Sequence, residues 1–219
     1  MFFGRRQGRA VKPYKQKLLE EKLPLIKLFV ENESIVCATP FDHFKRAYLE
    51  IGFGEGTHLA HLAEKNPDTL IIGCEPFING IGSCLAKIEE KKLSNVRIHD
   101  GPVQIILPYF SPAFFSKIFL LFPDPWPKKR HFKRRIVSAK NMQEFLQLLK
   151  LDGVFIFASD HEGYREWALD VFRGLEGVRI VAEGFEPPSE WVETYFQKKG
   201  LKAGRDSYFI TLQQGFLKN

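Results

Sequence analysis

From Ala47 onwards, short apolar runs rich in β-branched and aromatic residues alternate with longer stretches whose apolar positions recur every three or four residues. The short runs predict strands at 48–51, 69–74, 96–99, 117–122 and 154–158, and the longer stretches predict helices at 57–65, 78–92, 103–107, 138–149 and 162–172. Strands and helices that alternate at this spacing are typical of a mostly parallel sheet covered by helices on both faces.

The two ends of the chain follow a different pattern. Residues 16–29 have helical spacing with Pro24 inside, and 35–38 resemble a short extended segment. After the last helix, the pattern predicts a strand at 178–182, a helix at 189–199 and a strand at 208–212. Two final strands after five strand–helix units indicate an antiparallel edge, so we expect a doubly wound, Rossmann-like α/β sheet of seven strands. No repeat or Gly/Ser-rich linker divides the 219 residues, which predicts one domain over 1–219 with a basic N-terminal arm at about 1–17.

The net charge of +6 is concentrated in two segments, 1–17 and 128–135, each of which holds six basic residues and no acid. Elsewhere the acids outnumber the basic residues. Local positive charge of this kind suits a polyanion such as RNA, although a solvated tail and loop are the simpler alternative. The candidates for contact with an RNA backbone are Arg5, Arg6, Arg9, Lys129, Arg130, Lys133, Arg134 and Arg135.

Other features exclude whole classes of protein. The apolar runs are too short to span a membrane, and the N-terminus turns basic before a secretory signal can form, so we expect a cytoplasmic protein. Cys37, Cys74 and Cys84 show no paired spacing and are expected to be reduced thiols. His58 and His61 lack a nearby ligating carboxylate or thiol, and we expect them on a helix face, with no metal site.

A glycine-rich turn follows the strand at 48–51, with the sequence Glu50-Ile51-Gly52-Phe53-Gly54-Glu55-Gly56. Gly52 and Gly54 permit a close approach to a ligand, but the third glycine of the dinucleotide pattern is missing. The turn therefore favours an adenosine over a pyrophosphate and disfavours an NAD-dependent oxidoreductase.

Three acids accompany this turn. Glu75, at the end of the second strand, is positioned to accept both hydroxyls of a ribose. Glu50 is expected to be partly buried and to need a cationic or donor partner, which the sulfonium and amino group of S-adenosylmethionine would provide. Asp100, after the third strand, could meet the adenine amino group.

The segment after the fourth strand reads Phe122-Pro123-Asp124-Pro125-Trp126-Pro127-Lys128-Lys129-Arg130-His131. Three prolines in five residues restrict the backbone and place one acid and one indole beside the basic run. With the glycine turn, Gly73-Cys74-Glu75, Ser159-Asp160, Thr194-Tyr195-Phe196 and the basic arm at 4–9, this segment resembles the tRNA (guanine-N7-)-methyltransferase family of class I enzymes. The resemblance spans nearly the whole chain.

That resemblance implies methylation of N7 of guanosine 46 in the tRNA variable loop, with S-adenosyl-L-methionine as donor. It implies that Glu50, Glu75 and Asp100 or Gly101 hold the donor and that Asp124 lies in the active site, in contact with the cofactor. It further implies substrate contacts by Lys128, Asp160, Thr194, Tyr195, Phe196 and Gln197, where Gln197 stands in place of the family's Glu.

The chemistry of guanine leads to similar expectations. Its N7 carries a lone pair and no proton, so attack on the sulfonium methyl needs no general base and depends on positioning. A carboxylate at Asp124 or Asp160 would stabilise the positive charge that develops on the base, or accept from N1 and N2. Trp126 could stack on the base or serve a purely structural role in packing. The alternatives are a class I methyltransferase that acts on another RNA or a small molecule, and a non-catalytic RNA-binding module; a monomer and a homodimer are both compatible with the sequence.

Overall fold

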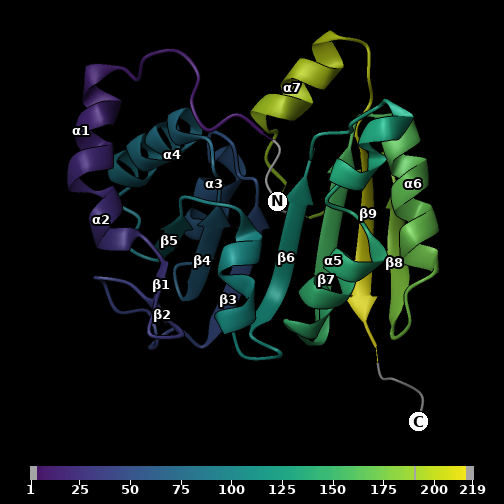
Figure 1. Ribbon diagram of the computed structural model, residues 1–219, viewed down its shortest axis with the longest axis horizontal. Coiled ribbons are helices and arrows are strands. Elements are labelled where there is room, and N and C mark those ends of the chain that lie inside the picture. Colours follow the sequence, from purple (N-terminus) through teal and green to yellow (C-terminus); the bar gives the residue numbers. More distant parts are fainter. Residues whose placement is uncertain (1–3, 190, 216–219) are drawn as a thin grey trace. The chain divides into compact units, whose positions relative to one another are not determined.

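The computed structural model describes residues 4–189 and 191–215, which fall into two compact units with the division between Ser111 and Pro112. In the first unit, three parallel strands lie in the order β5 (Val96–His99), β4 (Thr69–Cys74) and β3 (Arg46–Ile51). Helices α3 (Thr57–Lys65) and α4 (Ile78–Glu90) follow β3 and β4, as Figure 1 shows. Every residue of β4 and β5 is buried. Such continuously buried strands are typical of a parallel sheet covered on both faces.

The N-terminal part of this unit differs from the prediction. The helix expected over 16–29 is instead α1 (Pro13–Glu21) and α2 (Leu23–Ile26), and Phe29 begins a hairpin of β1 (Phe29–Glu31) and β2 (Ser34–Val36). Pro24 explains the interruption, because proline fits the first turn of a helix but removes a hydrogen bond from its interior. The helix expected at 103–107 is two 3₁₀ turns, Val103–Ile105 and Leu107–Tyr109, the second with Pro108 in its first turn.

The second unit contains β6 (Phe115–Leu121), a 3₁₀ segment at Lys129–Arg134, α5 (Ala139–Gln147), β7 (Leu149–Ser159), α6 (Glu162–Arg173), β8 (Val178–Gly184), α7 (Tyr195–Lys202) and β9 (Tyr208–Gln214). Its strands lie side by side in the order β6-β7-β9-β8 (Figure 1). The pair β6–β7 is parallel, whereas β9 is antiparallel to both neighbours. The predicted antiparallel edge is therefore confirmed.

Aromatic side chains attach helix α6 to strand β7. The rings of Phe155 and Phe157 on β7 contact Phe172 of α6 edge-on at centroid distances of 6.2 and 5.7 Å, and Phe157 also contacts Tyr164 at 5.7 Å. All four side chains are buried. Such pairs add to the stability that burial of apolar area supplies, and they fix α6 relative to β7.

Two element boundaries in the second unit also differ from the prediction. The helix expected at 189–199 covers 195–202 instead, because Thr194 caps it through a hydrogen bond from the backbone N–H of Gln197 to Thr194 Oγ1, 3.1 Å long. Strand β7 begins at Leu149, so the preceding helix ends at Gln147.

Among the described residues, the sheet strands number three in the first unit and four in the second, which confirms the predicted Rossmann-like α/β class with seven strands. The single domain expected from the sequence stays a prediction. No helix among the described residues is both long and apolar enough to cross a bilayer.

Candidate active site

The glycine-rich turn lies at the carboxyl end of β3, where Gly52, Gly54 and Gly56 have φ values of +73°, +54° and +70°. A side chain on Gly52 would meet no atom within 4 Å, which leaves the backbone open to a ligand. A side chain on Gly56 would collide with Cys84 of α4. The turn therefore needs glycine for its conformation, and at Gly56 also for packing.

Glu50 is 3% exposed and finds a partner inside the protein, since its Oε2 lies 3.0 Å from Nδ1 of His58. A carboxylate accepts hydrogen bonds, so Nδ1–H of the imidazole donates. His58 lies in helix α3, as expected, but it is only 3% exposed, and the expectation that no carboxylate lies near it is wrong. The pair meets the need for a partner that burial of Glu50 creates.

Glu75 lies one residue beyond β4 and is 8% exposed. Its Oε2 accepts from the backbone N–H of Gly54 at 2.8 Å, and its Oε1 accepts from the N–H of Phe77 at 2.9 Å. Each oxygen of the carboxylate thus accepts from a backbone N–H, and these two bonds fix its orientation. Glu75 thus joins the glycine turn to the start of α4.

The parallel register brings the acids of the first unit to one edge of the sheet. Ile51 pairs with Cys74, and Cys74 pairs with His99, so Glu50, Glu75 and Asp100 all stand at the carboxyl ends of neighbouring strands. Asp100 forms an ion pair with Lys27, with 2.7 Å between Oδ2 and Nζ. Gly101 is buried against the His99 ring, with which an added side chain would collide.

The backbone of the N-terminal arm is hydrogen-bonded to the start of α4. The N–H of Ile78 donates to the carbonyl of Arg6 at 2.9 Å. The side chain of Asn79 accepts from the N–H of Gly8 through Oδ1 and donates to the carbonyl of Arg9 through Nδ2, each at 2.8 Å. The backbone is held while the side chains of Arg5, Arg6 and Arg9 are exposed. This arrangement leaves three positive charges available to a polyanion.

Asp124 and Asp160 stand at the carboxyl ends of two parallel neighbours in the second unit, β6 and β7, where Leu121 pairs with Ala158. Asp124 lies at the surface between Pro123 and Pro125. The protein around it replaces part of the hydration of its carboxylate, and this desolvation raises the pKa of Asp124 above its ordinary value. Asp160 is 19% exposed.

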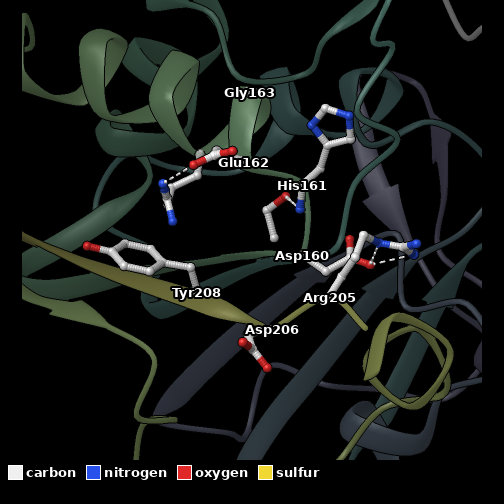
Figure 2. Close-up of a pocket in the computed structure, with 9 residues that line it drawn as sticks. Asp160, His161, Glu162, Gly163, Arg205, Asp206 and Tyr208 are labelled. Atoms are coloured by element: carbon white, nitrogen blue, oxygen red, sulfur yellow. Dashed lines mark hydrogen bonds and ion pairs between the residues drawn. The ribbon is translucent and has the colours of Figure 1, made fainter. Parts of the chain in front are cut away.

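Arg205 holds Asp160 in place. Its Nε and Nη2 both approach Oδ2 of Asp160, at 2.9 and 2.8 Å, as Figure 2 shows. Gly200 of α7 packs so closely against the same carboxylate that an added side chain would lie 2.6 Å from Oδ2. Asp160 and Arg205 line an open pocket of about 460 Å³. Its other walls include His161, Glu162, Arg165, Asp206 and Tyr208. Asp160 therefore presents a fixed carboxylate to this pocket.

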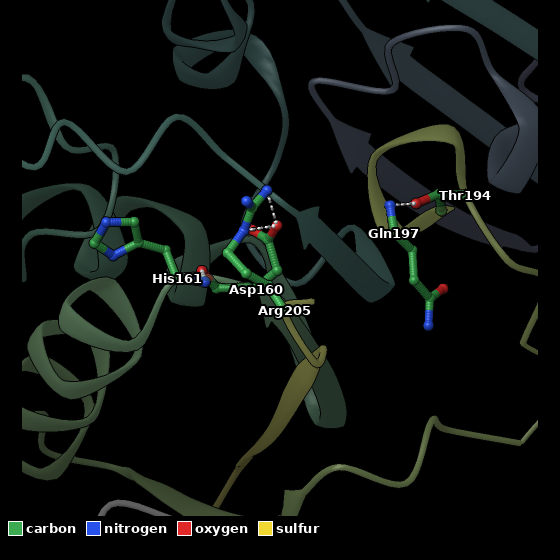
Figure 3. Close-up of polar contacts among 6 residues, drawn as sticks. Asp160, His161, Thr194, Gln197 and Arg205 are labelled. Carbon is green, nitrogen blue, oxygen red and sulfur yellow. Dashed lines mark hydrogen bonds and ion pairs between the residues drawn. The ribbon is translucent and has the colours of Figure 1, made fainter. Parts of the chain in front are cut away.

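The Thr194–Gln197 stretch begins α7 (Figure 3). Tyr195 and Phe196 are exposed, whereas Thr194 is buried. The side chain of Gln197 accepts from the indole N–H of Trp191 through Oε1 at 2.7 Å. Because an indole N–H can only donate, this contact fixes the amide and leaves its NH₂ group as the free donor. Gln197 also lines a second pocket of about 240 Å³ with Phe185, Leu201, Asp206 and Ser207.

The basic run after β6 separates into exposed and buried residues. Lys128, Lys129, Arg130 and Lys133 are exposed. The guanidinium carbon of Arg134 lies 4.8 Å from the centre of the Trp126 ring, and Trp126 meets His131 edge-on. Desolvation and the charges of Arg134, Arg130 and Lys128 lower the pKa of His131. Arg135 differs from the others, because it is only 5% exposed and its guanidinium is occupied by protein contacts.

Three contacts of this site were missed by sequence reasoning. The spacing of eight residues between Glu50 and His58, on a turn followed by a helix, was a usable signal for their pairing. The contacts of Arg205 with Asp160 and of Trp191 with Gln197 depend on how α7 and β9 return to the sheet, which no local pattern indicates.

Comparisons with known proteins bear on this arrangement. Residues 45–210 match the family model described as "Putative methyltransferase". The chain is 39% identical over 217 residues to the tRNA (guanine-N(7)-)-methyltransferase of Agrobacterium fabrum, covering 96% of this chain and 93% of the relative. It is 37% identical over 219 residues to the protein of that name from Rhizobium meliloti, covering 97% and 94%. Among solved structures, the 16S rRNA methyltransferase KamB superposes with a TM-score of 0.65 at 15% identity, covering 86% of this chain and all of that one.

Proposed function

This chain belongs to the tRNA (guanine-N(7)-)-methyltransferase family, and on that premise we propose that it transfers the methyl group of S-adenosyl-L-methionine to N7 of guanosine 46 in the tRNA variable loop. The observation that carries the proposal is similarity to relatives of that name over 96% of the chain. Within the chain, Glu75 at the glycine turn and the carboxylates of Asp124 and Asp160 are the groups that this chemistry requires.

The glycine turn supports binding of the methyl donor. Glu75 is buried and is oriented by two backbone N–H groups, and its carboxylate is an acceptor of the kind that binds the two hydroxyls of a ribose. Gly52 allows the backbone to approach a ligand closely. When bound, S-adenosyl-L-methionine supplies an electrophilic methyl group on a sulfonium centre. The residues proposed to hold it are Glu50, Gly52, Gly54, Glu75 and Asp100.

The proposed work of the second unit is positioning and charge stabilisation. Guanine N7 needs no general base, so the chain has to orient the base and meet the positive charge that develops on it. Asp160, fixed by Arg205, can accept hydrogen bonds from N1–H and N2–H of guanine. Asp124, between two prolines, is proposed to stabilise the developing charge. The amide NH₂ of Gln197 is suited to donate to an acceptor such as O6, where a Glu side chain could only accept.

The raised pKa of Asp124 predicts a pH dependence. Only the ionised carboxylate stabilises positive charge, so the single-turnover rate should fall as the pH is lowered through the pKa of Asp124, above the ordinary value of about 3.9. The rate would be measured from about pH 8 down to the lowest pH at which circular dichroism shows the protein folded. Asp124→Asn should be slow at every pH, without this fall in rate. The same fall in Asp124→Asn would assign the titration to another group.

The exposed basic residues predict a salt-dependent affinity for tRNA. Replacement of Lys129, Arg130 and Lys133 by Ala should reduce the slope of log K against log salt by roughly 2, since each phosphate contact to irregular RNA contributes about 0.7. Fluorescence titration at several salt concentrations measures the slope. A triple replacement of the exposed Lys65, Lys92 and Lys140 removes the same charge and should leave the slope unchanged. If both triple variants have the wild-type slope, the basic residues at 128–133 are solvated and do not contact RNA.

The proposed function is tested by incubation of the protein with unmodified tRNA and methyl-labelled donor, followed by analysis of the digested nucleosides. Label in 7-methylguanosine supports the proposal. Label in another nucleoside, or only in a small molecule, would favour a different methyltransferase. A protein that binds RNA but neither binds the donor nor transfers a methyl group would favour a non-catalytic RNA-binding module. A cytoplasmic location accords with the free thiols of Cys37, Cys74 and Cys84.

A further inference from the structure

The segment around Asp124 holds two aromatic residues in a left-handed backbone conformation. Phe122 has a φ of +51° and Trp126 a φ of +42°, one on each side of the Pro-Asp-Pro sequence. Bulky residues rarely adopt this conformation, and it persists only where surrounding contacts impose it. The amide of Phe122 is held at the strand end by its hydrogen bond to the Ala158 carbonyl, 2.8 Å long. A comparable constraint is required at the other end of the segment.

Arg135 supplies that constraint. Its Nε donates to the carbonyl oxygen of Pro125 at 2.9 Å, and its Nη1 lies 3.5 Å from the carbonyl oxygen of Gly163 in α6. The guanidinium carbon lies 3.8 Å from the centre of the Phe132 ring, 5.0 Å from that of Tyr164 and 5.1 Å from that of Trp167. One buried cation thus connects the residue directly after Asp124 to helix α6.

The backbone beyond Arg135 is fixed to the same helix. The indole N–H of Trp167 donates to the carbonyl of Val137 at 2.8 Å, and the N–H of Val137 donates to the hydroxyl of Tyr164 at 3.3 Å. Arg135 therefore extends from a rigid anchor towards Pro125. It is 5% exposed, whereas Lys133, two residues earlier, is exposed. A guanidinium in this position has little surface left for a phosphate.

We infer that Arg135 is a positioning residue for Asp124, not a contact to the RNA backbone: its guanidinium clamps the Pro125 carbonyl to α6 and so fixes the direction of the Asp124 carboxylate. This inference rests on the proposed function, because it concerns the rate of the same methyl transfer. It also replaces the expectation that Arg135 contacts an RNA backbone.

The clamp depends on the shape of the guanidinium. A planar group can stack on aromatic rings through its faces while its edge donates to two carbonyls, whereas an ammonium is a compact point charge without such an edge. Lysine at 135 keeps the charge and most of the length but loses the paired geometry. Arg135→Lys therefore separates a role in positioning from a role as a positive charge.

The experiment compares Arg135→Lys and Lys133→Ala with wild type, under conditions in which circular dichroism shows all three folded. Arg135→Lys should lower kcat by about 10- to 100-fold, since small displacements of a reacting group cost about that much, while KM for tRNA and the salt slope stay within twofold of wild type. Lys133→Ala should raise KM and flatten the salt slope. An Arg135→Lys variant with wild-type kcat would overturn the inference, as would one whose only defect is a weaker salt slope.

Two further measurements separate positioning from general structural support. In an Asp124→Ala background, Arg135→Lys should have little additional effect on kcat, because Arg135 acts through Asp124; additive losses would contradict the inference. In Arg135→Ala, guanidinium ion at low, non-denaturing concentration should restore part of kcat relative to the same concentration of sodium, and no restoration would contradict it. Absence of 7-methylguanosine with wild type would instead refute the proposed function.

Discussion

Replacement of Asp124 by Ala is expected to lower the single-turnover rate of methyl transfer by about 100-fold or more, in line with the loss of one preorganised electrostatic group. Asp124 lies at the surface of a proline-restricted segment whose ends are fixed by contacts of Phe122 and Arg135, so its removal should disturb the fold little. Binding of tRNA and of the donor, measured by titration, should remain nearly intact.

Two further variants give this prediction its controls. Asp124→Asn should be only partly better than Ala, since an amide keeps the shape and loses the charge. Gln197→Ala should cost less than Asp124→Ala, because Gln197 brings no charge and its amide oxygen is already occupied by Trp191. Full activity of Asp124→Ala under single-turnover conditions would remove Asp124 from the reaction.

Replacement of Glu75 by Ala should weaken binding of S-adenosyl-L-methionine by about 1 to 3 kcal/mol, which is roughly a 5- to 150-fold rise in Kd. The variant loses a buried acceptor for two hydroxyls and also releases the N–H groups of Gly54 and Phe77. Calorimetry on the folded protein measures the effect, and the affinity for tRNA should hardly change.

Glu55 provides the matched control for Glu75. It lies in the same turn with an exposed side chain, so Glu55→Ala removes an identical charge without a buried hydrogen-bond acceptor. We expect donor affinity close to that of wild type for this variant. If Glu55→Ala and Glu75→Ala weaken donor binding equally, the effect is one of overall charge, and Glu75 does not hold the ribose.

Much of the fold could be predicted because short apolar runs alternate with stretches of helical periodicity from β3 to α6. The alternation of strands and helices from β3 to α6 could be read from local sequence patterns. The antiparallel β9 was expected because two strands follow the last strand–helix unit. The prediction was wrong where one residue overrides periodicity: Pro24 ends one helix and starts another, and Thr194 moves the start of α7 by capping it.

The candidate site could be predicted only as a set of residue types at strand ends. Glu75 and Asp124 were expected where predicted strands end, because ligands of parallel sheets bind at the carboxyl ends of the strands. Asp160 was expected from the family resemblance alone. The partners could not be predicted in the same way. Arg205 is 45 residues from Asp160, and the buried state of Arg135 depends on the aromatic face of α6, so in both cases only the folded chain decides which charge is exposed.

Transfer to tRNA that carries 7-deazaguanosine at position 46 tests the central claim most directly. This base has a carbon in place of N7 and keeps the N1, N2 and O6 groups that the site is proposed to read. We expect the substituted tRNA to bind with unchanged affinity and to receive no methyl group, while the matched tRNA with guanosine 46 yields 7-methylguanosine at that position. Equal methylation of both tRNAs, or no 7-methylguanosine in either, would contradict the account.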